Sequence, residues 1–416
     1  MEIIFPKFLF VILSCDFILM SCNGIVSHKI AGGRSLSSCI DGGRPKGYLK
    51  DPDLYMTTTD LIKKLGYSAE EHVVLTEDGY YLTIHRIPGK PGSTPVLAQH
   101  GILCSSFDWV FSGKNRSLAL ILSDNGYDVW LGNARGNTYS ECHTTYTKSD
   151  YEFWNFSWHE MGVYDLPAVI NYINQKTHKD LIYIGHSMGS TMSYVMAIER
   201  PDVAEKVKAI FSLAPVAHTH GKKGPMSWGA YIIQELENFG RTTRLGYVLA
   251  QDHSVKYGLQ DLCTTSASRR KFCAFFIFAF FGFNSAQFNY EKLPLLLSHT
   301  PAGASMKVII HFCQMMNSER FSRYDHGKKK NSRVYNSTNA PDYDLSKMKI
   351  PLGLFWAEND LVTSSKNVQR LYDEVPNKIL KYEVDDEKFN HIDFMWAKDA
   401  NKLVYSHLLA AMEPYR

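Results

Sequence analysis

LIYIGHSMG, residues 181–189, decides the fold of this chain. Its first four residues are apolar and predict a strand, whereas its last five fit the pattern G-x-S-x-G. Residues 191–197, which follow it, can form a helix. A strand, a tight turn flanked by glycines and a helix together form a nucleophile elbow, in which only glycine fits beside the serine. We therefore predict an α/β protein in which Ser187 presents its hydroxyl at the carboxyl end of a strand.

A histidine and an acid follow this serine in the order that the architecture requires. A nucleophilic serine needs a base, and the base needs a carboxylate that orients it. Residues 351–356 predict a buried strand that is followed by Asp360, and residues 381–384 predict another that leads through a polar loop to His391. Loops after strands are where an α/β sheet gathers its chemistry. We predict that Ser187, Asp360 and His391 form a catalytic triad.

Other polar residues lie close to these three in the sequence. Glu358 is an alternative orienting acid, since it precedes Asp360 by only two positions. His186 adjoins the nucleophile, but its side chain should point away from Ser187 and pack within the elbow. For three further acids we expect a role in a solvated loop or a helix cap: Asp385, Asp386 and Asp393. The remaining histidines lack the spacing of metal ligands, so we predict no metal site.

The oxyanion hole should combine the amide after the nucleophile with one from a loop after an earlier strand. Residues 94–99 predict that strand, and His100 and Gly101 follow it. Gly101 lets the backbone approach closely. We therefore predict that the backbone amides of Ile102 and Met188 are the two donors.

Ordered blocks from about Asp51 to the C-terminus resemble the acid lipase family, which comprises animal gastric and lysosomal lipases and their insect relatives. The blocks are Leu65-Gly66-Tyr67, Thr76-Glu77-Asp78-Gly79-Tyr80, Gln99-His100-Gly101, Gly126-Tyr127-Asp128-Val129-Trp130-Leu131-Gly132-Asn133, Arg135-Gly136-Asn137, Tyr164-Asp165-Leu166-Pro167-Ala168, Leu213-Ala214-Pro215-Val216-Ala217, Pro301-Ala302-Gly303 and Asn390-His391-Ile392-Asp393-Phe394. The resemblance implies an α/β-hydrolase fold with an inserted helical cap, and ester hydrolysis through an acyl-enzyme without a cofactor. It places the same three residues at the triad and the same two amides at the oxyanion hole. Relatives commonly carry glutamine where this chain has Met188.

The rhythm of strands and helices predicts the domain boundaries. Predicted strands alternate with helical segments, as in a mostly parallel sheet, and end near Gln99, Leu131, Ile184 and Leu213. The alternation stops after Ala217 and resumes at Asp344. We therefore predict an α/β-hydrolase core over residues 51–217 and 342–416, interrupted by a helical cap or lid over residues 218–341.

Inside the predicted cap, the run from Phe272 to Phe283 is strongly aromatic. Its 12 residues are too few to span a bilayer. Two interpretations stay open. The run is either a buried helix of the cap, or a surface that lines an acyl-chain tunnel or faces lipid when the lid moves.

The N-terminus predicts entry into the secretory pathway. Lys7 precedes apolar runs that extend to Met20, and small residues follow, as in a signal peptide over residues 1–24. Ser14 and Asp16 interrupt the apolar stretch, which argues against a membrane span. Residues 25–50 are rich in Gly, Ser and Arg, and we expect a poorly ordered segment or a pro-segment. A secreted or lysosomal protein is the expected outcome.

Cysteines and sequons fit that compartment. Of the 8 cysteines, Cys263 and Cys273 are the best candidate pair by proximity, and the family resemblance also implies a disulfide in this region. Outside the leader, four more stay unassigned: Cys39, Cys104, Cys142 and Cys313. Asn115 and Asn336 are candidate glycosylation sites, whereas we expect Asn155 to be crowded by the aromatic residues that flank it.

Composition narrows the classes of partner. A chain of 416 residues with 45% hydrophobic content can bury a large core, and a net charge of +3 is too small to indicate nucleic acid. We expect Lys328-Lys329-Lys330 in a solvated loop, and the partner to be a lipid substrate at a lipid–water interface. Two other functions stay open. An esterase for smaller or sterol esters would share every catalytic residue, and a non-catalytic lipid-binding relative would have lost a triad residue, which this chain has not.

Overall fold

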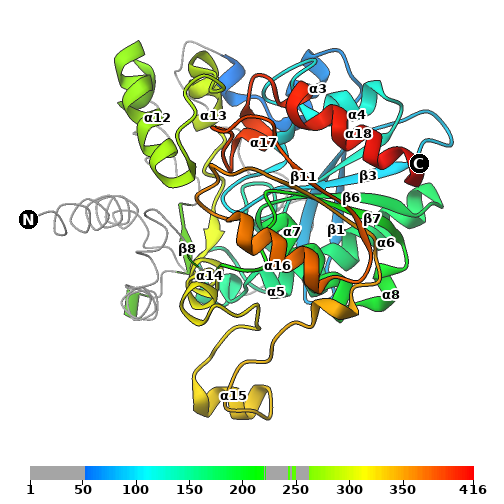
Figure 1. Cartoon of the computed structure of the whole chain (residues 1–416), viewed down its shortest axis with the longest axis vertical. Helices are drawn as coiled ribbons and strands as arrows, with labels where there is room; N and C mark the ends of the chain where they lie inside the picture. The colour runs from blue at the N-terminus through cyan, green and yellow to red at the C-terminus, as the bar shows by residue number, and fades with distance from the viewer. Residues whose placement is uncertain (1–51, 220, 222–241, 244–245, 250–261) are drawn as a thin grey trace, which may run out of the picture.

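The computed structural model describes residues 52–219, 221, 242–243, 246–249 and 262–416 (Figure 1). The predicted signal peptide and the whole of the predicted N-terminal segment over residues 25–50 lie outside the described residues. The same holds for most of the chain between residues 220 and 261.

A mostly parallel sheet of nine strands forms the centre of the described molecule, as predicted. The strand order is β1-β2-β4-β3-β6-β7-β10-β11, and β5 pairs with β2. Its members are β1 (Glu70–Leu75), β2 (Tyr80–Ile87), β3 (Pro95–Gln99), β4 (Asp128–Gly132), β5 (Cys142–His143), β6 (Leu181–His186), β7 (Val207–Leu213), β10 (Leu352–Trp356) and β11 (Lys378–Glu383). The strands from β4 to β11 in this order run parallel, so their carboxyl ends share one edge.

Burial along the strands explains the apolar runs in the sequence. The strands β3, β4 and β6 are buried at every residue, as expected for parallel strands covered on both faces. The edge strand β11 is exposed or partly exposed at every residue. The strands β1 and β2 pair antiparallel and begin the sheet.

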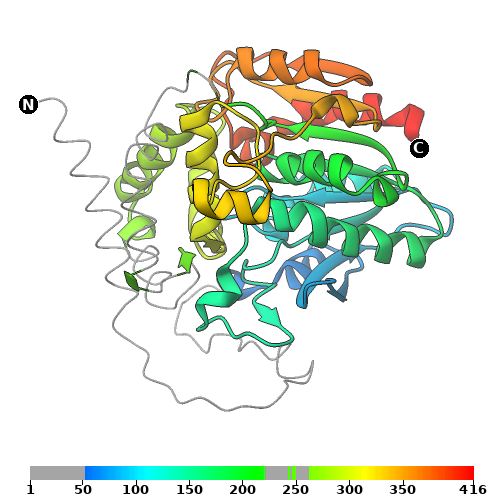
Figure 2. The same ribbon diagram turned by 90° about the horizontal axis from the view of Figure 1, so that it is seen from below.

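Helices cover both faces of the sheet (Figures 1 and 2). One apolar core lies under α3 (Thr58–Lys64), α4 (Leu118–Asp124), α17 (Asp393–Trp396) and α18 (Ser406–Met412). The other lies under α6 (Leu166–Thr177), α7 (Met188–Glu199), α8 (Pro201–Ala204) and α16 (Ser365–Glu374). The result is the three-layer arrangement of an α/β hydrolase.

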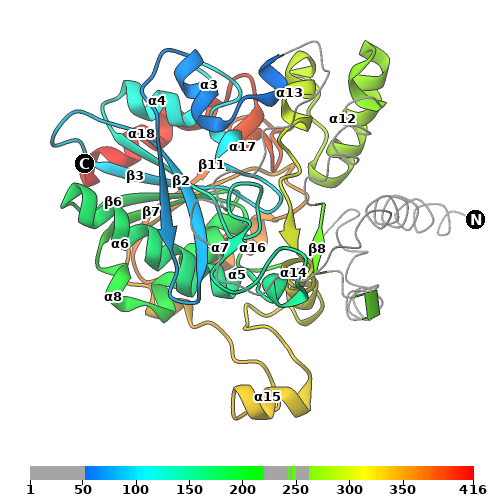
Figure 3. The same cartoon turned by 180° about the vertical axis from the view of Figure 1, so that it is seen from behind.

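The described part of the segment between β7 and β10 is mainly helical and stands to one side of the sheet (Figures 1 and 3). It contains β8 (Tyr247–Val248), α12 (Ala267–Phe281), α13 (Leu293–Leu297), β9 (Ala304–Ser305), α14 (Met306–Ser318) and α15 (Lys328–Val334). The antiparallel pair of β8 and β9 was not predicted. The three lysines expected in a loop instead begin α15, a short helix that projects from the body, although they are exposed as expected.

A disulfide joins Cys263 to Cys273 with a Cα–Cα distance of 5.6 Å, and so ties the middle of α12 to the residues before the helix. Cys142 is also disulfide-bonded, whereas Cys104 and Cys313 are thiols. Within the described ranges, no helix combines the length and the apolar character that crossing a bilayer requires.

Candidate active site

Ser187 sits on the predicted elbow, between the end of β6 and the start of α7. Its backbone has φ 52° and ψ −118°, a conformation that few residues other than glycine adopt. A Cβ added to Gly185 would lie 2.7 Å from the Ser190 nitrogen, and one added to Gly189 would lie 2.4 Å from the Gln99 oxygen. Both positions therefore require glycine, because backbone atoms occupy the space that a side chain would need.

The structure brings together the three residues of the predicted triad. The Nε2 atom of His391 lies 2.8 Å from the Ser187 hydroxyl, and Nδ1 lies 2.8 Å from a carboxylate oxygen of Asp360. An ionised carboxylate can only accept, so Nδ1 carries the hydrogen and Nε2 accepts from the serine hydroxyl. All three residues are buried, with exposed fractions of 6%, 5% and 3% for Ser187, Asp360 and His391. The arrangement can activate a serine for attack on a carbonyl.

The Asp360 carboxylate is held by its own loop. Its Oδ1 atom accepts hydrogen bonds from the backbone amides of Val362 at 2.7 Å and Thr363 at 3.0 Å. This leaves Oδ2 directed at His391. Glu358, the alternative acid, is exposed to solvent. The geometry therefore selects Asp360 as the carboxylate in contact with the imidazole.

The three acids near His391 take up local roles. Asp385 is exposed, and Asp386 accepts a hydrogen bond from the Lys388 amide at 2.9 Å within the loop. Asp393 is the first residue of α17 and is buried, so the solvated setting expected as one possibility does not apply to it. Its carboxylate accepts from the Asn390 amide at 3.0 Å and from the Asn284 side chain at 2.8 Å. Burial raises the pKa of Asp393 to about 7.

The loop that carries Ile102 packs directly against the elbow. A Cβ on Gly101 would lie 3.0 Å from the Ser187 Cβ and 3.1 Å from the Nδ1 atom of His186. A side chain at this position would push the loop and the elbow apart by a few tenths of an ångström. Neither the Ile102 amide nor the Met188 amide donates a hydrogen bond to another group of the described residues. Both are therefore available to a ligand oxygen.

Asp108 braces this loop, and the sequence analysis did not identify it. Its carboxylate accepts from the Ser105 amide at 2.9 Å, from the Trp396 indole at 3.1 Å and from the Thr300 hydroxyl at 3.2 Å. Burial raises its pKa to about 6. The pattern S-x-x-D at Ser105 was a detectable signal, since it forms a capping box here. No local sequence pattern indicates the contacts of Asp108 with Trp396 and Thr300, which are distant from it along the chain.

His186 packs in the elbow as expected, and it also makes one specific contact. Its Nε2 atom lies 2.9 Å from the backbone oxygen of His391. Because a carbonyl oxygen only accepts, Nε2 carries the hydrogen. Burial, followed by the nearby His391, lowers the pKa of His186 to about 3, so this imidazole stays neutral in mild acid.

The remaining predicted positions are as follows. Met188 is 2% exposed and packs into the apolar core beneath α7, so its side chain points away from solvent. Asn115 and Asn336 are exposed. Asn155 is exposed too, and the expected crowding is wrong, because Trp154 and Phe156 on either side turn inward while Asn155 turns outward.

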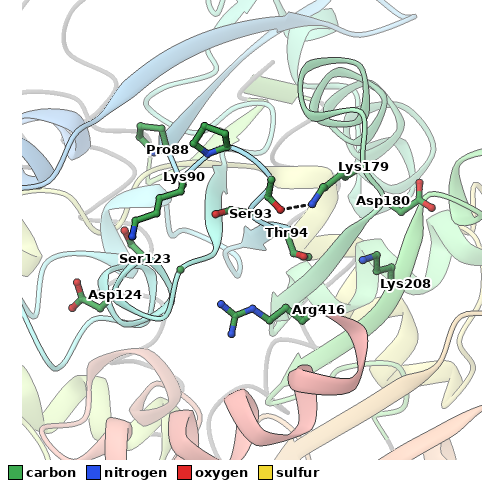
Figure 4. A pocket seen from close by; sticks show the side chains of 14 residues that line it. Pro88, Lys90, Ser93, Thr94, Ser123, Asp124, Lys179, Asp180, Lys208 and Arg416 are labelled. Carbon is green, nitrogen blue, oxygen red and sulfur yellow. Dashed lines mark hydrogen bonds between the residues drawn. The ribbon is translucent and has the colours of Figure 1, made fainter.

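A separate hollow of about 990 Å³ lies at the opposite edge of the sheet, near the amino ends of β3, β6 and β7 (Figure 4). Charged side chains line it: Lys90, Asp124, Lys179, Asp180, Lys208 and Arg416. It contains no residue of the triad. Within the part of the chain that the structure describes, no group of three or more His, Cys, Asp or Glu side chains is arranged to hold a metal ion.

Two family models match the chain. The partial alpha/beta-hydrolase lipase region matches residues 58–113, and the alpha/beta hydrolase fold matches residues 94–239. A solved structure of a "putative lipase" from Sulfolobus solfataricus superposes with a TM-score of 0.54 at 14% identity, covering 81% of this chain and 90% of that chain. At this identity the superposition supports the fold alone.

Three relatives match most of the chain. Lipase 1 of Drosophila melanogaster is 38% identical, over 86% of this chain and 80% of the relative. Human gastric triacylglycerol lipase is 37% identical, over 86% and 91%. Rat lysosomal acid lipase/cholesteryl ester hydrolase is 36% identical, over 90% and 96%.

Proposed function

Since this chain belongs to the family of gastric and lysosomal acid lipases, we propose that it hydrolyses the carboxylic ester bonds of long-chain lipids, with Ser187 as the nucleophile. The observation that carries the proposal is the continuous hydrogen-bonded chain from Ser187 through His391 to Asp360, with 2.8 Å at each step.

The mechanism follows from the direction of these hydrogen bonds. The Ser187 oxygen attacks the ester carbonyl while Nε2 of His391 takes its proton. The tetrahedral intermediate collapses, and the imidazolium passes that proton to the leaving alcohol. Water then attacks the acyl-enzyme with His391 as base again, which releases the fatty acid and restores Ser187. Asp360 keeps the imidazole in the tautomer that accepts at Nε2 and stabilises its charged form.

The Ile102 and Met188 amides would stabilise the oxyanion of each tetrahedral intermediate. Their support is the approach of Gly101 to Ser187 and the absence of a protein acceptor for either amide among the described residues. Removing one such donor typically costs roughly 3 kcal/mol of transition-state stabilisation. No cofactor is needed, because acyl transfer requires only these amides and the triad.

Long lipid chains fit the composition of the segment over residues 218–341, which we assign as the cap. On α12 and just beyond it, Phe272, Phe275 and Phe283 are 56%, 53% and 49% exposed. Large exposed apolar side chains gathered in one place suit contact with lipid better than contact with water. An esterase for small soluble esters would have no use for this surface.

We also propose that the protein acts in the secretory pathway, secreted or lysosomal. The predicted signal peptide, the disulfide between Cys263 and Cys273 and the exposed sequons at Asn115 and Asn336 support that location.

The test is a substrate panel with the purified protein. Emulsified triolein, a cholesteryl ester emulsion and a soluble short-chain ester are each assayed from acidic to mildly alkaline pH. We expect the long-chain emulsions to be hydrolysed. Turnover of the short-chain ester alone would mean an esterase, and no turnover of any ester would mean a non-catalytic relative.

A further inference from the structure

His186 and Phe281 lie outside the triad, and both contact His391: His186 at the backbone carbonyl, and Phe281 at the ring and the backbone amide. Resting on the proposed function, we infer that His186 and Phe281 are positioning residues, which keep the imidazole aligned between Ser187 and Asp360. His186 comes from the elbow, whereas Phe281 is the last residue of α12.

The contact from the elbow is a hydrogen bond to the His391 carbonyl. His186 is buried, and its Nε2–H donates to the His391 oxygen over 2.9 Å. The Nδ1 atom of His186 is also buried and has no hydrogen-bond partner in the described residues. A buried imidazole with one nitrogen unsatisfied is costly, so an apolar side chain would serve packing alone better. Compared with an apolar side chain, His186 adds the hydrogen-bond donor at Nε2.

The contact from α12 is both a ring contact and a backbone contact. The Phe281 ring stacks on the His391 imidazole, with ring centroids 5.8 Å apart and the planes 11° apart. The Phe281 carbonyl accepts from the His391 amide at 3.4 Å and from the Leu361 amide at 3.5 Å. The end of α12 therefore touches the loop of the histidine and the loop of the acid together.

The residue after Phe281 shows how closely this end of α12 is seated. Gly282 has φ 116°, and a Cβ there would lie 2.2 Å from the Asn359 oxygen. Its carbonyl accepts from the Asn390 side chain at 2.9 Å. A conformation open almost only to glycine thus brings the aromatic ring onto the imidazole.

The two contacts restrict different motions. The hydrogen bond from His186 acts on the His391 peptide, whereas the Phe281 ring lies parallel to an imidazole whose residue is only 3% exposed. Two titratable side chains of the described residues face the imidazole: Asp360, whose carboxylate lies 2.8 Å from Nδ1, and His186, whose ring centroid lies 5.1 Å from that of His391. A displacement of about 1 Å in such a geometry can cost a hundred-fold in rate.

His186 is tested with two substitutions assayed on a soluble short-chain ester. His186→Leu removes the donor, and we expect kcat to fall at least about ten-fold with KM within about two-fold. His186→Gln can place an amide hydrogen near the Nε2 position, and it should restore kcat to within about three-fold of wild type. If the leucine variant does not fold, His186→Asn replaces it, since its shorter amide cannot reach the carbonyl.

Phe281 is tested through the pH profile of kcat/KM. In Phe281→Leu water gains access to the imidazole and favours its protonated form, so the acidic limb of the profile should shift to higher pH. The control is Phe288→Leu, because Phe288 is a buried ring that packs on Phe278 with a centroid distance of 5.3 Å. It should lower Tm without moving the limb.

Each result decides one way. The role of His186 is overturned if kcat is unchanged in His186→Leu. It is also overturned if His186→Gln is as impaired as His186→Leu. An acidic limb that stays in place in Phe281→Leu, or moves equally in Phe288→Leu, overturns the role of Phe281. If wild-type protein hydrolyses no ester at all, the proposed function fails instead.

Discussion

The elbow at residues 185–189 and the helix α12 both end against His391, but their conformations are specified in different ways. In the elbow, a side chain at Gly185 or Gly189 would displace backbone atoms, so this geometry allows only glycine at these two positions. In α12 aromatic residues occur on every side, and Phe278 is buried while Phe275, one turn earlier, is exposed.

The two regions therefore have different expected tasks: the elbow positions the reacting atoms, and α12 contributes to recognition of the substrate. Local contacts around Ser187 determine where the reacting atoms lie. For α12 the packing partners alone decide which phenylalanine serves the core, which meets solvent and which covers the catalytic imidazole. We therefore expect substitutions in the elbow and triad to impair every substrate, and substitutions on the exposed side of α12 to discriminate between substrates.

The largest expected effect belongs to the elbow. Ser187→Ala should lower kcat on every ester by more than about a thousand-fold, since loss of a triad member costs several orders of magnitude. Ester hydrolysis is measured with triolein and a short-chain ester, and folding by Tm. Residual turnover above about one part in a thousand would contradict nucleophilic catalysis by Ser187.

Replacement of the acid should be nearly as damaging. Asp360→Asn should lower kcat by about a thousand-fold or more, because the imidazole then adopts the wrong tautomer. Glu358→Gln is the matched control, and since Glu358 is exposed we expect turnover within two-fold of wild type. The reverse outcome would show that Glu358 orients His391.

On α12 the effect should depend on the substrate. The double variant Phe272→Ser, Phe275→Ser should lower activity on emulsified triolein at least about ten-fold. Burying a whole ring contributes roughly 1.5–3 kcal/mol, and these rings, 56% and 53% exposed, each have about half of that burial left to gain at a lipid surface. Turnover of a soluble short-chain ester should stay near wild type.

A matched control removes exposed aromatics elsewhere. Tyr146 and Tyr151 are 40% and 38% exposed, and replacing both with Ser should spare both substrates. Equal losses on both substrates in the α12 variant, with a lower Tm, would mean that these phenylalanines belong to the core.

A smaller effect is expected at Met188, the position at which relatives commonly carry glutamine. Met188→Gln should leave kcat within a few-fold, because the backbone amide and not the side chain would meet the oxyanion. Tm should fall, since Met188 is buried and an amide in apolar surroundings costs about 1–3 kcal/mol. A hundred-fold loss of kcat would show that the side chain shapes the oxyanion loop.

The smallest effect concerns the pH dependence of stability. The pKa of Asp393 is raised from 3.8 to about 7 in the folded protein, so the folded state binds the proton more tightly. Its contribution to stability is present in acid and is lost as pH rises through about 7. Asp393→Asn resembles the neutral acid, and so relative to wild type its Tm should gain a few degrees between pH 5 and pH 8. A Tm difference that is the same at both pH values would refute this assignment.

The sequence predicted the parts of the molecule that depend on near neighbours. Strands that end near Gln99, Ile184 and Leu213 were recognisable because buried parallel strands are apolar throughout, and the loops that follow them hold Ser187 and the Ile102 amide. Asp360 and His391 were predicted from the same rule.

Features that arise between distant segments were not predictable. Asp108 meets Trp396 across 288 positions, and no local pattern encodes that contact. The pair of β8 and β9 is two residues long on each side, too short to give an alternation. Asn155 points to solvent although the aromatic rings on either side of it are buried. The aromatic neighbours in the sequence could not indicate this orientation. The stacking of Phe281 on His391 depends on how α12 packs, and residues 272–281 of this helix are apolar on every side and give no preferred face.

The distance along the chain between Ser187 and His391 has a consequence for biosynthesis. The two residues are 204 positions apart, and Asn284, which bonds Asp393 behind the histidine, is 109 positions from its partner. Contacts of such long range form late in folding. The ribosome therefore delivers the nucleophile well before the base that activates it, and the half-made chain carries a serine without reactivity. Under the proposed mechanism, ester hydrolysis therefore requires that the loop after β11 has already docked on the elbow, and a chain that has not reached that stage lacks the base for Ser187.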